Sequence, residues 1–173
     1  MILQLNGEVI EKLDTHIGLL HRGTEKLIET KKYLLGLPYF DRLDYCSMLA
    51  QEHSYCLSLE YLNFCENTNI YNLNIRTLFD ELTRILNHML ALSCHALDVG
   101  SMSTLFWAFE EREYIMEFYE RISGARMHAA FYRPFEFSNG YLTKNFLHDI
   151  LLFSRHCITT LNEMHNVLTY NKI

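Results

Sequence analysis

Positive charge lies beside two glycines in a short stretch near the start of the sequence. In GLLHRGTEK (18–26), His21 supplies a titratable charge and Arg22 a permanent one, between Gly18 and Gly23. The glycines allow the backbone to turn tightly or to approach another group closely. The stretch is therefore a candidate binding loop. The alternative is an ordinary loop that leads into a helix N-terminus.

The other histidines do not form a metal site by spacing. His88 and His95 are seven residues apart and share a helix face, but a further ligand three or four residues away is missing. His16 and His21 are equally unsupported. The sequence also suggests no serine–histidine–acid triad and contains neither GxGxxG nor a Walker pattern. Dinucleotide binding is therefore not expected.

Composition excludes several classes of function. The 173 residues suit one domain with a core, and a chain that is 49% hydrophobic is expected to fold. The net charge of −6 argues against a nucleic-acid partner. The five cysteines form no CxxC pair, which fits a reducing compartment and removes the thiolates of a nickel–iron centre or an iron–sulfur cluster. No apolar run approaches the roughly 18 residues that span a bilayer, so the chain is expected to be peripheral to any membrane.

The sequence predicts a mainly α single domain, 1–173, with a β-hairpin over 1–14 and a helical core over 15–173. Asn6-Gly7, between MILQL and EVIEKL, is the dipeptide of a type I′ turn. Four long helices with short loops imply a bundle. Apolar spacing and capping residues predict the helices at 24–33 (ended by Gly36 and Pro38), 42–64 (capped by Asp41 or Asp44), 75–97, 104–132 (capped by Ser103 or Thr104) and 144–170.

Each long helix carries one apolar stripe at helical spacing. Glu110 and Glu113, in the charge run EERE, are expected on a solvated face. The stripe residues are Tyr45, Met48, Leu49, Cys56, Leu59 and Leu62; Ile75, Leu78, Phe79, Leu82, Ile85, Leu86, Met89 and Leu90; Leu105, Ala108, Phe109, Met116 and Tyr119; and Leu147, Ile150, Leu151, Ile158, Leu161 and Leu168.

Several longer motifs give the chain a resemblance to a known family. After GLLHRGTEK come PYFDRLDY (38–45), RTLFDELTRILNH (76–88), HALDVG (95–100), FWAFEEREYIMEFYERISGARMHAA (106–130) and a weaker LTYNKI at the end. Together they resemble the hydrogenase-like large subunit, of the 49-kDa type, of respiratory complex I (NADH:quinone oxidoreductase). The resemblance covers almost the whole chain and implies a hydrogenase large-subunit-like fold.

Two parts of the family pattern are missing from this sequence. The N-terminal HPAAHG-type loop, which supplies a quinone-binding histidine, would precede Met1, and the C-terminal half would follow LTYNKI. We therefore expect either a fragment of the subunit or a subunit built from separate chains.

The resemblance implies two catalytic residues. The tyrosine that ends RLDY, Tyr45, matches one that hydrogen-bonds a quinone carbonyl. A phenol stays protonated at neutral pH and can donate to an oxygen that gains charge on reduction. Asp98, in HALDVG, matches the partner of the quinone-binding histidine, whose imidazolium it would favour. Read without the resemblance, Tyr45 is an interior tyrosine and Asp98 a helix C-terminal residue.

Three further residues are implied near an iron–sulfur cluster held by a neighbouring subunit. His128, in GARMHAA, matches a histidine whose protonation is linked to cluster reduction. Arg22 matches an arginine close to the same cluster, and Arg126 is expected to assist. None is expected to be a ligand, and this chain is expected to bind no metal or cofactor alone. Without the resemblance, His128 is a core histidine on a helix.

The function implied is that of a peripheral-arm core subunit that forms part of the ubiquinone-reduction site and couples electron transfer to proton pumping. Its implied partners are the small subunit with the terminal 4Fe–4S cluster, the 30-kDa-type subunit, and companion chains that supply the missing parts. The implied location is the matrix side of the mitochondrial inner membrane. The alternative is a structural or assembly module that has lost the quinone chemistry.

Overall fold

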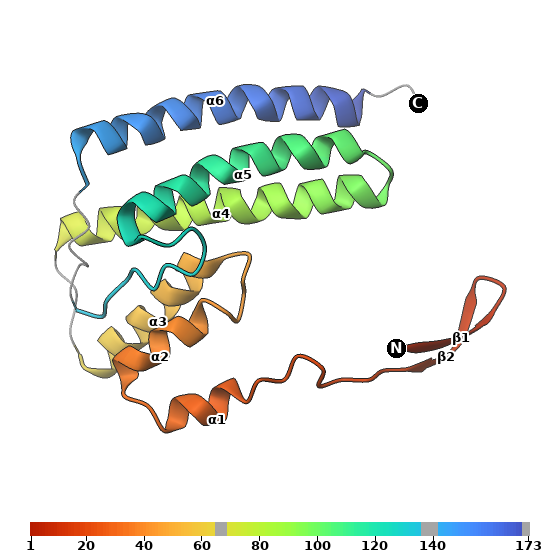
Figure 1. Ribbon diagram of the computed structural model, residues 1–173, viewed down its shortest axis with the longest axis horizontal. Coiled ribbons are helices and arrows are strands. Elements are labelled where there is room, and N and C mark those ends of the chain that lie inside the picture. Colours follow the sequence, from red (N-terminus) through yellow and green to blue (C-terminus); the bar gives the residue numbers. More distant parts are fainter. Residues whose placement is uncertain (65–68, 136–141, 171–173) are drawn as a thin grey trace. The chain divides into compact units, whose positions relative to one another are not determined.

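The computed structural model describes residues 1–64, 69–135 and 142–170, and in these ranges the chain is mainly α-helical with two strands (Figure 1). Residue contacts divide the chain into two compact units, 1–32 and 33–173. Each unit is described by itself. The prediction of a single domain across the whole chain stays a prediction.

The first unit contains the expected hairpin. Strands β1 (Ile2–Asn6) and β2 (Val9–Asp14) pair antiparallel, with a register shift after Gln4. The turn residues are Gly7 and Glu8 rather than Asn6-Gly7, and only Gly7 has a positive φ, of 63°. A type I′ turn needs positive φ at both central residues, so the predicted turn type is wrong.

The same unit ends in a short helix, α1 (Thr24–Glu29), that buries no residue. Gly23 precedes it in the left-handed conformation with a φ of 62°, which suits glycine. The His21 Nδ1 accepts a hydrogen bond from the Gly23 N–H at 2.9 Å. The predicted turn is therefore present, and a histidine side chain fixes it.

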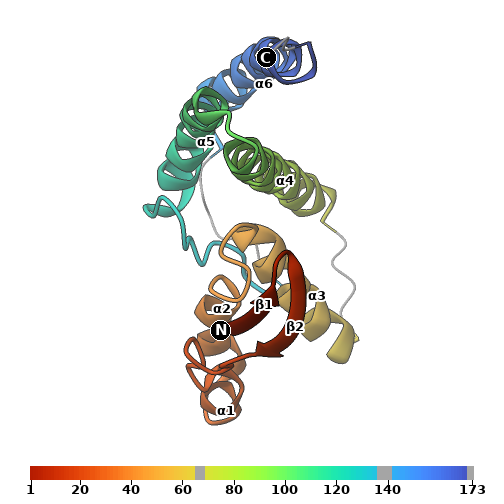
Figure 2. The same cartoon turned by 90° about the vertical axis from the view of Figure 1, so that its right-hand side faces the viewer.

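The second unit consists of five helices in its described part: α2 (Tyr33–Phe40), α3 (Met48–Leu62), α4 (Ile70–Asp98), α5 (Met102–Ser123) and α6 (Lys144–Thr169). They pack in chain order, α2 on α3, α3 on α4, α4 on α5 and α5 on α6. Figure 1 and Figure 2 show α4, α5 and α6 side by side. The four-helix bundle and the hydrogenase-like fold stay predictions.

One core runs through all five helices. On α4 the predicted stripe is confirmed except at Leu90, because its other residues are buried or pack against the core. On α6 it is mostly wrong, since only Ile150 of the predicted stripe is buried. The other five residues are exposed, whereas Phe146, Phe153 and Cys157 are buried. Leu62 and Phe109 are also exposed. No described helix is long and apolar enough to cross a membrane.

Two predicted helix boundaries near the start of this unit are wrong. Gly36 and Pro38 lie inside α2 and do not end a helix. Gly36 and Leu37 are buried, so packing maintains this turn despite its poor helix formers. Helix α3 starts at Met48 instead of Arg42, because the Asp44 carboxylate accepts the Cys46 N–H at 3.1 Å and stabilises a turn there.

Three more boundaries depend on caps. Helix α4 starts at Ile70, five residues early, because the Asn69 side chain accepts the Tyr71 N–H. Helix α5 is preceded by Ser101 and ends at Ser123, nine residues early, because Gly124 adopts the left-handed C-cap conformation with a φ of 81°. Helix α6 agrees with the prediction to one residue. Residues 66–68 and Gly140 of the predicted loops lie outside the described residues.

Candidate functional site

Tyr45 lies on the turn between α2 and α3, and its side chain faces solvent. It is 58% exposed, so the reading of an interior tyrosine is wrong. The turn is fixed on both sides, by the Asp44 carboxylate on the Cys46 N–H and by the Asp44 carbonyl on the Ser47 N–H. A phenol on a fixed, exposed turn is available to a ligand or to a partner chain.

Asp98 is the last residue of α4 and is exposed. The backbone ends there in a tight turn, in which the Val99 N–H donates to the His95 carbonyl and the Ser101 N–H to the Ala96 carbonyl. The described hydrogen bonds and ion pairs do not join Asp98 to Tyr45. Each residue therefore presents its polar group outward.

Cys46, which follows Tyr45, is influenced electrostatically by Cys94 on α4 and by the buried Arg112 on α5. Burial and the Asp44 carboxylate raise the pKa of Cys46. Cys94 also raises this pKa, whereas Arg112 lowers it. Cys94 is on α4, one turn before Asp98. The turn that carries Tyr45 therefore lies beside the last turns of α4.

Arg112 provides a buried positive charge beneath this region. It is 4% exposed and donates to the Leu86 carbonyl, and its guanidinium lies 5.5 Å from the Phe109 ring centre. Burial lowers its pKa. The solvated-face prediction is confirmed for Glu110 and Glu113, which are exposed, whereas Arg112 and Glu111 of the same run are buried.

After Gly124 the chain runs as a non-helical segment, residues 125–135, and this segment carries Arg126 and His128. The prediction that His128 lies on a helix is therefore wrong, because Gly124 ends α5. His128 is half-buried, and its Nδ1 atom is buried without a hydrogen-bond partner among the described atoms. Arg126 is exposed and forms an ion pair with Glu113.

Two buried carboxylic acids hold the end of this segment. Asp41 and Glu52 are both 0% exposed. The Asp41 Oδ2 atom accepts the Ala130 N–H at 3.1 Å. The Glu52 Oε2 atom accepts the Phe131 and Tyr132 N–H groups at 2.7 and 2.9 Å. Three consecutive backbone donors thus point at two carboxyl groups.

A buried ion pair holds the segment further along. Arg76 on α4 makes two parallel hydrogen bonds to the Glu60 carboxylate, at 2.7 and 3.0 Å, and both side chains are at most 5% exposed. The same carboxylate accepts the Phe135 N–H at 3.0 Å, and Arg76 also donates to the Arg133 carbonyl. Burial alone would raise the pKa of Glu60, but the bonds from Arg76 and Phe135 outweigh it and lower the pKa.

A polar cavity of about 380 Å³ lies between α3 and α4. His53 on its wall forms an ion pair with Asp80, at 2.5 Å between Nδ1 and Oδ2, and the Tyr132 hydroxyl donates to the other Asp80 oxygen. The His53 Nε2 atom is buried without a described partner. The cavity therefore ends on a hydrogen-bonded chain that leads to the segment.

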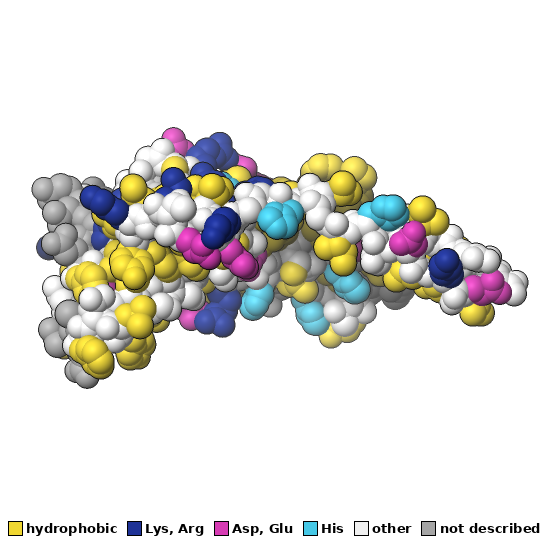
Figure 3. Space-filling model, turned by 90° about the horizontal axis from the view of Figure 1, so that it is seen from below, with side chains coloured by type: hydrophobic (Ala, Val, Ile, Leu, Met, Phe, Trp, Pro, Cys, Tyr) yellow, Lys and Arg dark blue, Asp and Glu magenta, His cyan; other side chains and the backbone are white. Residues whose placement is uncertain are grey.

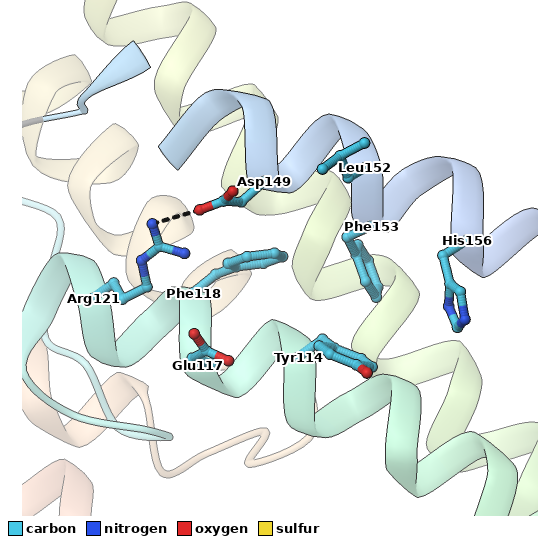
Figure 4. Close-up of a pocket in the computed structure, with 8 residues that line it drawn as sticks. All are labelled: Tyr114, Glu117, Phe118, Arg121, Asp149, Leu152, Phe153 and His156. Atoms are coloured by element: carbon cyan, nitrogen blue, oxygen red, sulfur yellow. Dashed lines mark hydrogen bonds and ion pairs between the residues drawn. The ribbon is translucent and has the colours of Figure 1, made fainter. Parts of the chain in front are cut away.

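A second groove lies between α5 and α6, and aromatic side chains form its base (Figure 4). Phe118 meets Phe153 edge-on at 5.6 Å, and Arg121 pairs with Asp149 at 2.7 Å. These contacts join the two helices directly. The groove is an interhelical packing contact and offers no group that is poised for chemistry.

The surface shows mixed charge. On the face in Figure 3, acidic, basic and histidine side chains are interspersed with exposed hydrophobic ones. That face shows no broad basic surface of the kind that binds a polyanion.

Comparison with known proteins finds close sequence relatives. The sequence profile described as "Respiratory-chain NADH dehydrogenase, 49 Kd subunit" matches residues 98–173. A NADH-ubiquinone oxidoreductase 49 kDa subunit of Paramecium tetraurelia is 68% identical over the whole of this chain. The NADH dehydrogenase [ubiquinone] iron-sulfur protein 2 of Arabidopsis thaliana is 54% identical over the same span. By sequence, the whole of this chain matches part of 49 kDa subunits of NADH-ubiquinone oxidoreductase. It spans 43% of the length of these relatives.

Metal-binding side chains are not clustered in the part of the chain that the structure describes. In the described ranges no three histidine, cysteine, aspartate or glutamate side chains are grouped to hold a metal. Burial raises the pKa of Cys56 to about 12 and that of Cys157 to about 11, so both stay thiols and are poor ligands. Cys65 lies outside the described residues.

The residues implied by the 49 kDa family fall into three places. Tyr45 lies on a turn beside the final turns of α4, and α4 ends at Asp98. His128 and Arg126 lie on the segment after α5. Arg22 is exposed in the first unit, and its predicted place near the iron–sulfur cluster of a neighbouring subunit stays a prediction.

Sequence reasoning missed the buried acids and the ion pair. Asp41 was considered only as a helix cap, and Glu52 and Glu60 were not considered at all. A signal was present, because Glu52 follows Met48 by four residues and precedes Cys56 by four, on the apolar stripe of α3. A carboxylate on a core stripe needs a buried partner.

Proposed function

We propose that this chain is a core peripheral-arm subunit of NADH:ubiquinone oxidoreductase and forms part of its ubiquinone-reduction site. The observation that carries the proposal is the exposed phenol of Tyr45 on a hydrogen-bonded turn, where Cys94 of α4 acts electrostatically on the adjacent Cys46. The family match supports the setting. The complete enzyme would couple this reduction to proton pumping, and the chain would not be active alone.

In this proposal Tyr45 donates a hydrogen bond to the quinone carbonyl. Its phenol is exposed and is therefore able to meet a headgroup that arrives from a partner-lined cavity. A donor aimed at an oxygen that gains negative charge stabilises the reduced state more than the oxidised one. Because the backbone of the turn is already fixed, binding would cost the phenol only the entropy of its own side chain.

Asp98 acts on a histidine supplied by another part of the subunit. Its carboxylate is exposed at the end of α4, where it is free of described ion pairs and able to pair with an incoming imidazole. A carboxylate beside an imidazole favours the imidazolium, which can protonate reduced quinone.

The segment after α5 faces the terminal 4Fe–4S cluster of the small subunit. His128 would take up a proton when the cluster gains an electron, because added negative charge raises the proton affinity of nearby groups. Arg22 and Arg126 would supply permanent positive charge near the same cluster. Their role is electrostatic, and none is a ligand.

The partners follow from this arrangement. They are the small subunit with the terminal cluster and the 30-kDa-type subunit. The location proposed is the matrix side of the mitochondrial inner membrane, as a peripheral part of the complex.

The decisive experiment is Tyr45→Phe in the assembled complex, with NADH-driven quinone reduction measured beside the amount of complex. We expect quinone reduction to fall by about tenfold or more, because one hydrogen bond to a developing charge is lost. Assembly should be unchanged, since the side chain is exposed.

Tyr61→Phe is the matched control. Tyr61 is at the opposite end of α3 and is 78% exposed, so its loss of a hydroxyl should leave the rate unchanged. Normal quinone reduction in Tyr45→Phe would favour the alternative function, a structural module that has lost the chemistry.

A further inference from the structure

We infer that Asp41 and Glu52 form a buried carboxyl pair that shares one proton and positions the segment carrying His128. The link to His128 chemistry rests on the function proposed above. The pair itself rests on the geometry of the helical unit. Both residues would be positioning residues, because they touch the backbone of the segment and no reacting atom.

The pair faces a row of backbone donors. Ala130, Phe131 and Tyr132 present consecutive N–H groups, and these are accepted by one oxygen of Asp41 and one oxygen of Glu52. Consecutive N–H groups of this kind form a concave anion site. The segment therefore binds the pair through one oxygen of each acid.

The second oxygen atoms of Asp41 and Glu52 could form a hydrogen bond with each other only if one of the two acids is protonated. Asp41 Oδ1 and Glu52 Oε1 are buried and accept no hydrogen bond from a described donor. Each side chain shifts the pKa of the other, which places the two carboxyl groups in one electrostatic environment. Two carboxylates cannot share a hydrogen bond, whereas an acid and a carboxylate can.

The surroundings assign the proton to Glu52. Burial and the contact with Asp41 raise the pKa of Glu52 to about 9, so it is protonated at neutral pH. Burial raises the pKa of Asp41 as well, but the proton donated by Glu52, the Ala130 N–H, His128 and Arg42 oppose that rise. Glu52 therefore donates and Asp41 carries the charge.

Other titratable groups also face the pair. Asp80 on α4 acts on the same two tyrosines that Glu52 affects. The groups in electrostatic contact with the pair are Arg42 after α2, Cys56 on α3, Tyr119 on α5, and His128 and Tyr132 on the segment.

The pair holds the segment in a conformation that it would not choose by itself. Ala130 has a φ of 43°, a left-handed value that is uncommon for a residue with a side chain. Its N–H is bound by Asp41, and His128 precedes it by only two residues. Loss of these bonds would release Ala130 and move the imidazole.

Amide substitutions test the shared proton because an amide mimics the protonated acid. In Glu52→Gln the amide oxygen accepts the two N–H groups and the amide NH₂ donates to Asp41. In Asp41→Asn the same logic places the charge on Glu52. Both single variants should assemble into the complex within about twofold of wild type. The double variant opposes two NH₂ groups, and its assembly should fall by far more than the product of the single effects.

The position of the segment is tested by measuring how the midpoint potential of the terminal cluster depends on pH in the assembled complex. In Glu52→Ala both N–H acceptors are gone, so the pH dependence of the cluster's midpoint potential should be weakened in whatever complex assembles. Glu52→Gln, which keeps an acceptor for both N–H groups, should show the wild-type pH dependence. If the charge of Glu52 were what mattered, Glu52→Gln would behave like Glu52→Ala instead. If Glu52→Ala does not assemble while Glu52→Gln does, the hydrogen-bonding role is supported directly.

Several outcomes overturn the inference. A Glu52→Gln chain that fails to assemble would show that Glu52 needs its charge. Independent, multiplicative effects of the two amide substitutions would remove the shared proton. Unchanged pH dependence in assembled Glu52→Ala would remove the link to His128. His128→Leu separates the proposals: if it leaves the potential's pH dependence intact, the proposed role of His128 fails, while the amide variants still test the pair.

Discussion

Helix α3 carries two buried glutamates that both accept hydrogen bonds from the segment after α5 but differ in their other partners. Glu52 and Glu60 are eight residues apart, and each accepts backbone N–H groups from the segment after α5. Glu60 is neutralised by the Arg76 guanidinium, through two hydrogen bonds. Glu52 forms no ion pair with a described cation, and its pKa is raised further by another acid, Asp41. At Glu60 the buried negative charge is balanced by Arg76, whereas at Glu52 protonation removes the charge.

The difference teaches that two equal side chains on one helix can have opposite requirements. At Glu60 burial is outweighed by Arg76 and the pKa is lowered, so the charged form is the native one. At Glu52 burial and Asp41 act together, the pKa rises to about 9, and the neutral form is the native one. The same substitution, Glu to Gln, should therefore give opposite results at the two positions.

The largest effect is expected for Glu60→Gln. It leaves the Arg76 guanidinium, 2% exposed, without its counter-charge. Removal of one partner of a buried ion pair costs about 3–5 kcal/mol. Urea unfolding of the full chain, followed by circular dichroism, measures this free energy.

Glu52→Gln is the matched control for that experiment. Because the native Glu52 is neutral, we expect a change of less than about 1 kcal/mol near neutral pH beyond the titration effect below. Equal destabilisation by the two substitutions would contradict the comparison, because it would mean that both glutamates are native as anions.

The second effect is a pH dependence of stability that Glu52 contributes. A raised native pKa means that its contribution is fully present below the ordinary value near 4.5 and is lost as pH rises toward about 9. Between these values the unfolded chain has released a proton that the native chain still holds, so stability falls by about 1.4 kcal/mol per pH unit from this group.

Glu52→Gln should remove that slope, since it has no proton to release. Unfolding midpoints of wild type and variant, taken at several pH values across this window, should diverge in favour of the variant as pH rises. Parallel curves for the two proteins would refute the neutral state of Glu52.

The sequence predicted what depends on local pattern. The hairpin, the stripe of α4 and the extent of α6 follow from alternation and from 3.6-residue spacing. The predicted ends failed where one residue decides: Gly124 stops α5 although the apolar pattern continues toward Tyr132. Because of that error, His128 was predicted on a helix and lies on a segment.

The buried acids could not be assigned from spacing alone. Glu52 is visible on the stripe of α3, but its partner Asp41 lies on the preceding turn and its two N–H donors lie 79 and 80 residues later. Only the tertiary fold brings these together. The exposure of Tyr45 was missed for a similar reason, since α3 begins three residues after it.

The smallest effect is expected where the two sites meet. Tyr132 donates its backbone N–H to Glu52, while its hydroxyl donates to the Arg76 carbonyl at 3.0 Å and to Asp80 at 3.1 Å. Tyr132→Phe keeps the ring and the N–H, and it should cost about 1–2 kcal/mol for the lost hydroxyl bonds. Tyr114→Phe, at a half-exposed ring on α5, should cost less. The slope of stability against pH should be the same in Tyr132→Phe as in wild type, because Glu52 keeps both of its donors. If the slope changes, then the hydroxyl also holds the segment against Glu52, and the two glutamates belong to one cooperative site instead of two separate ones.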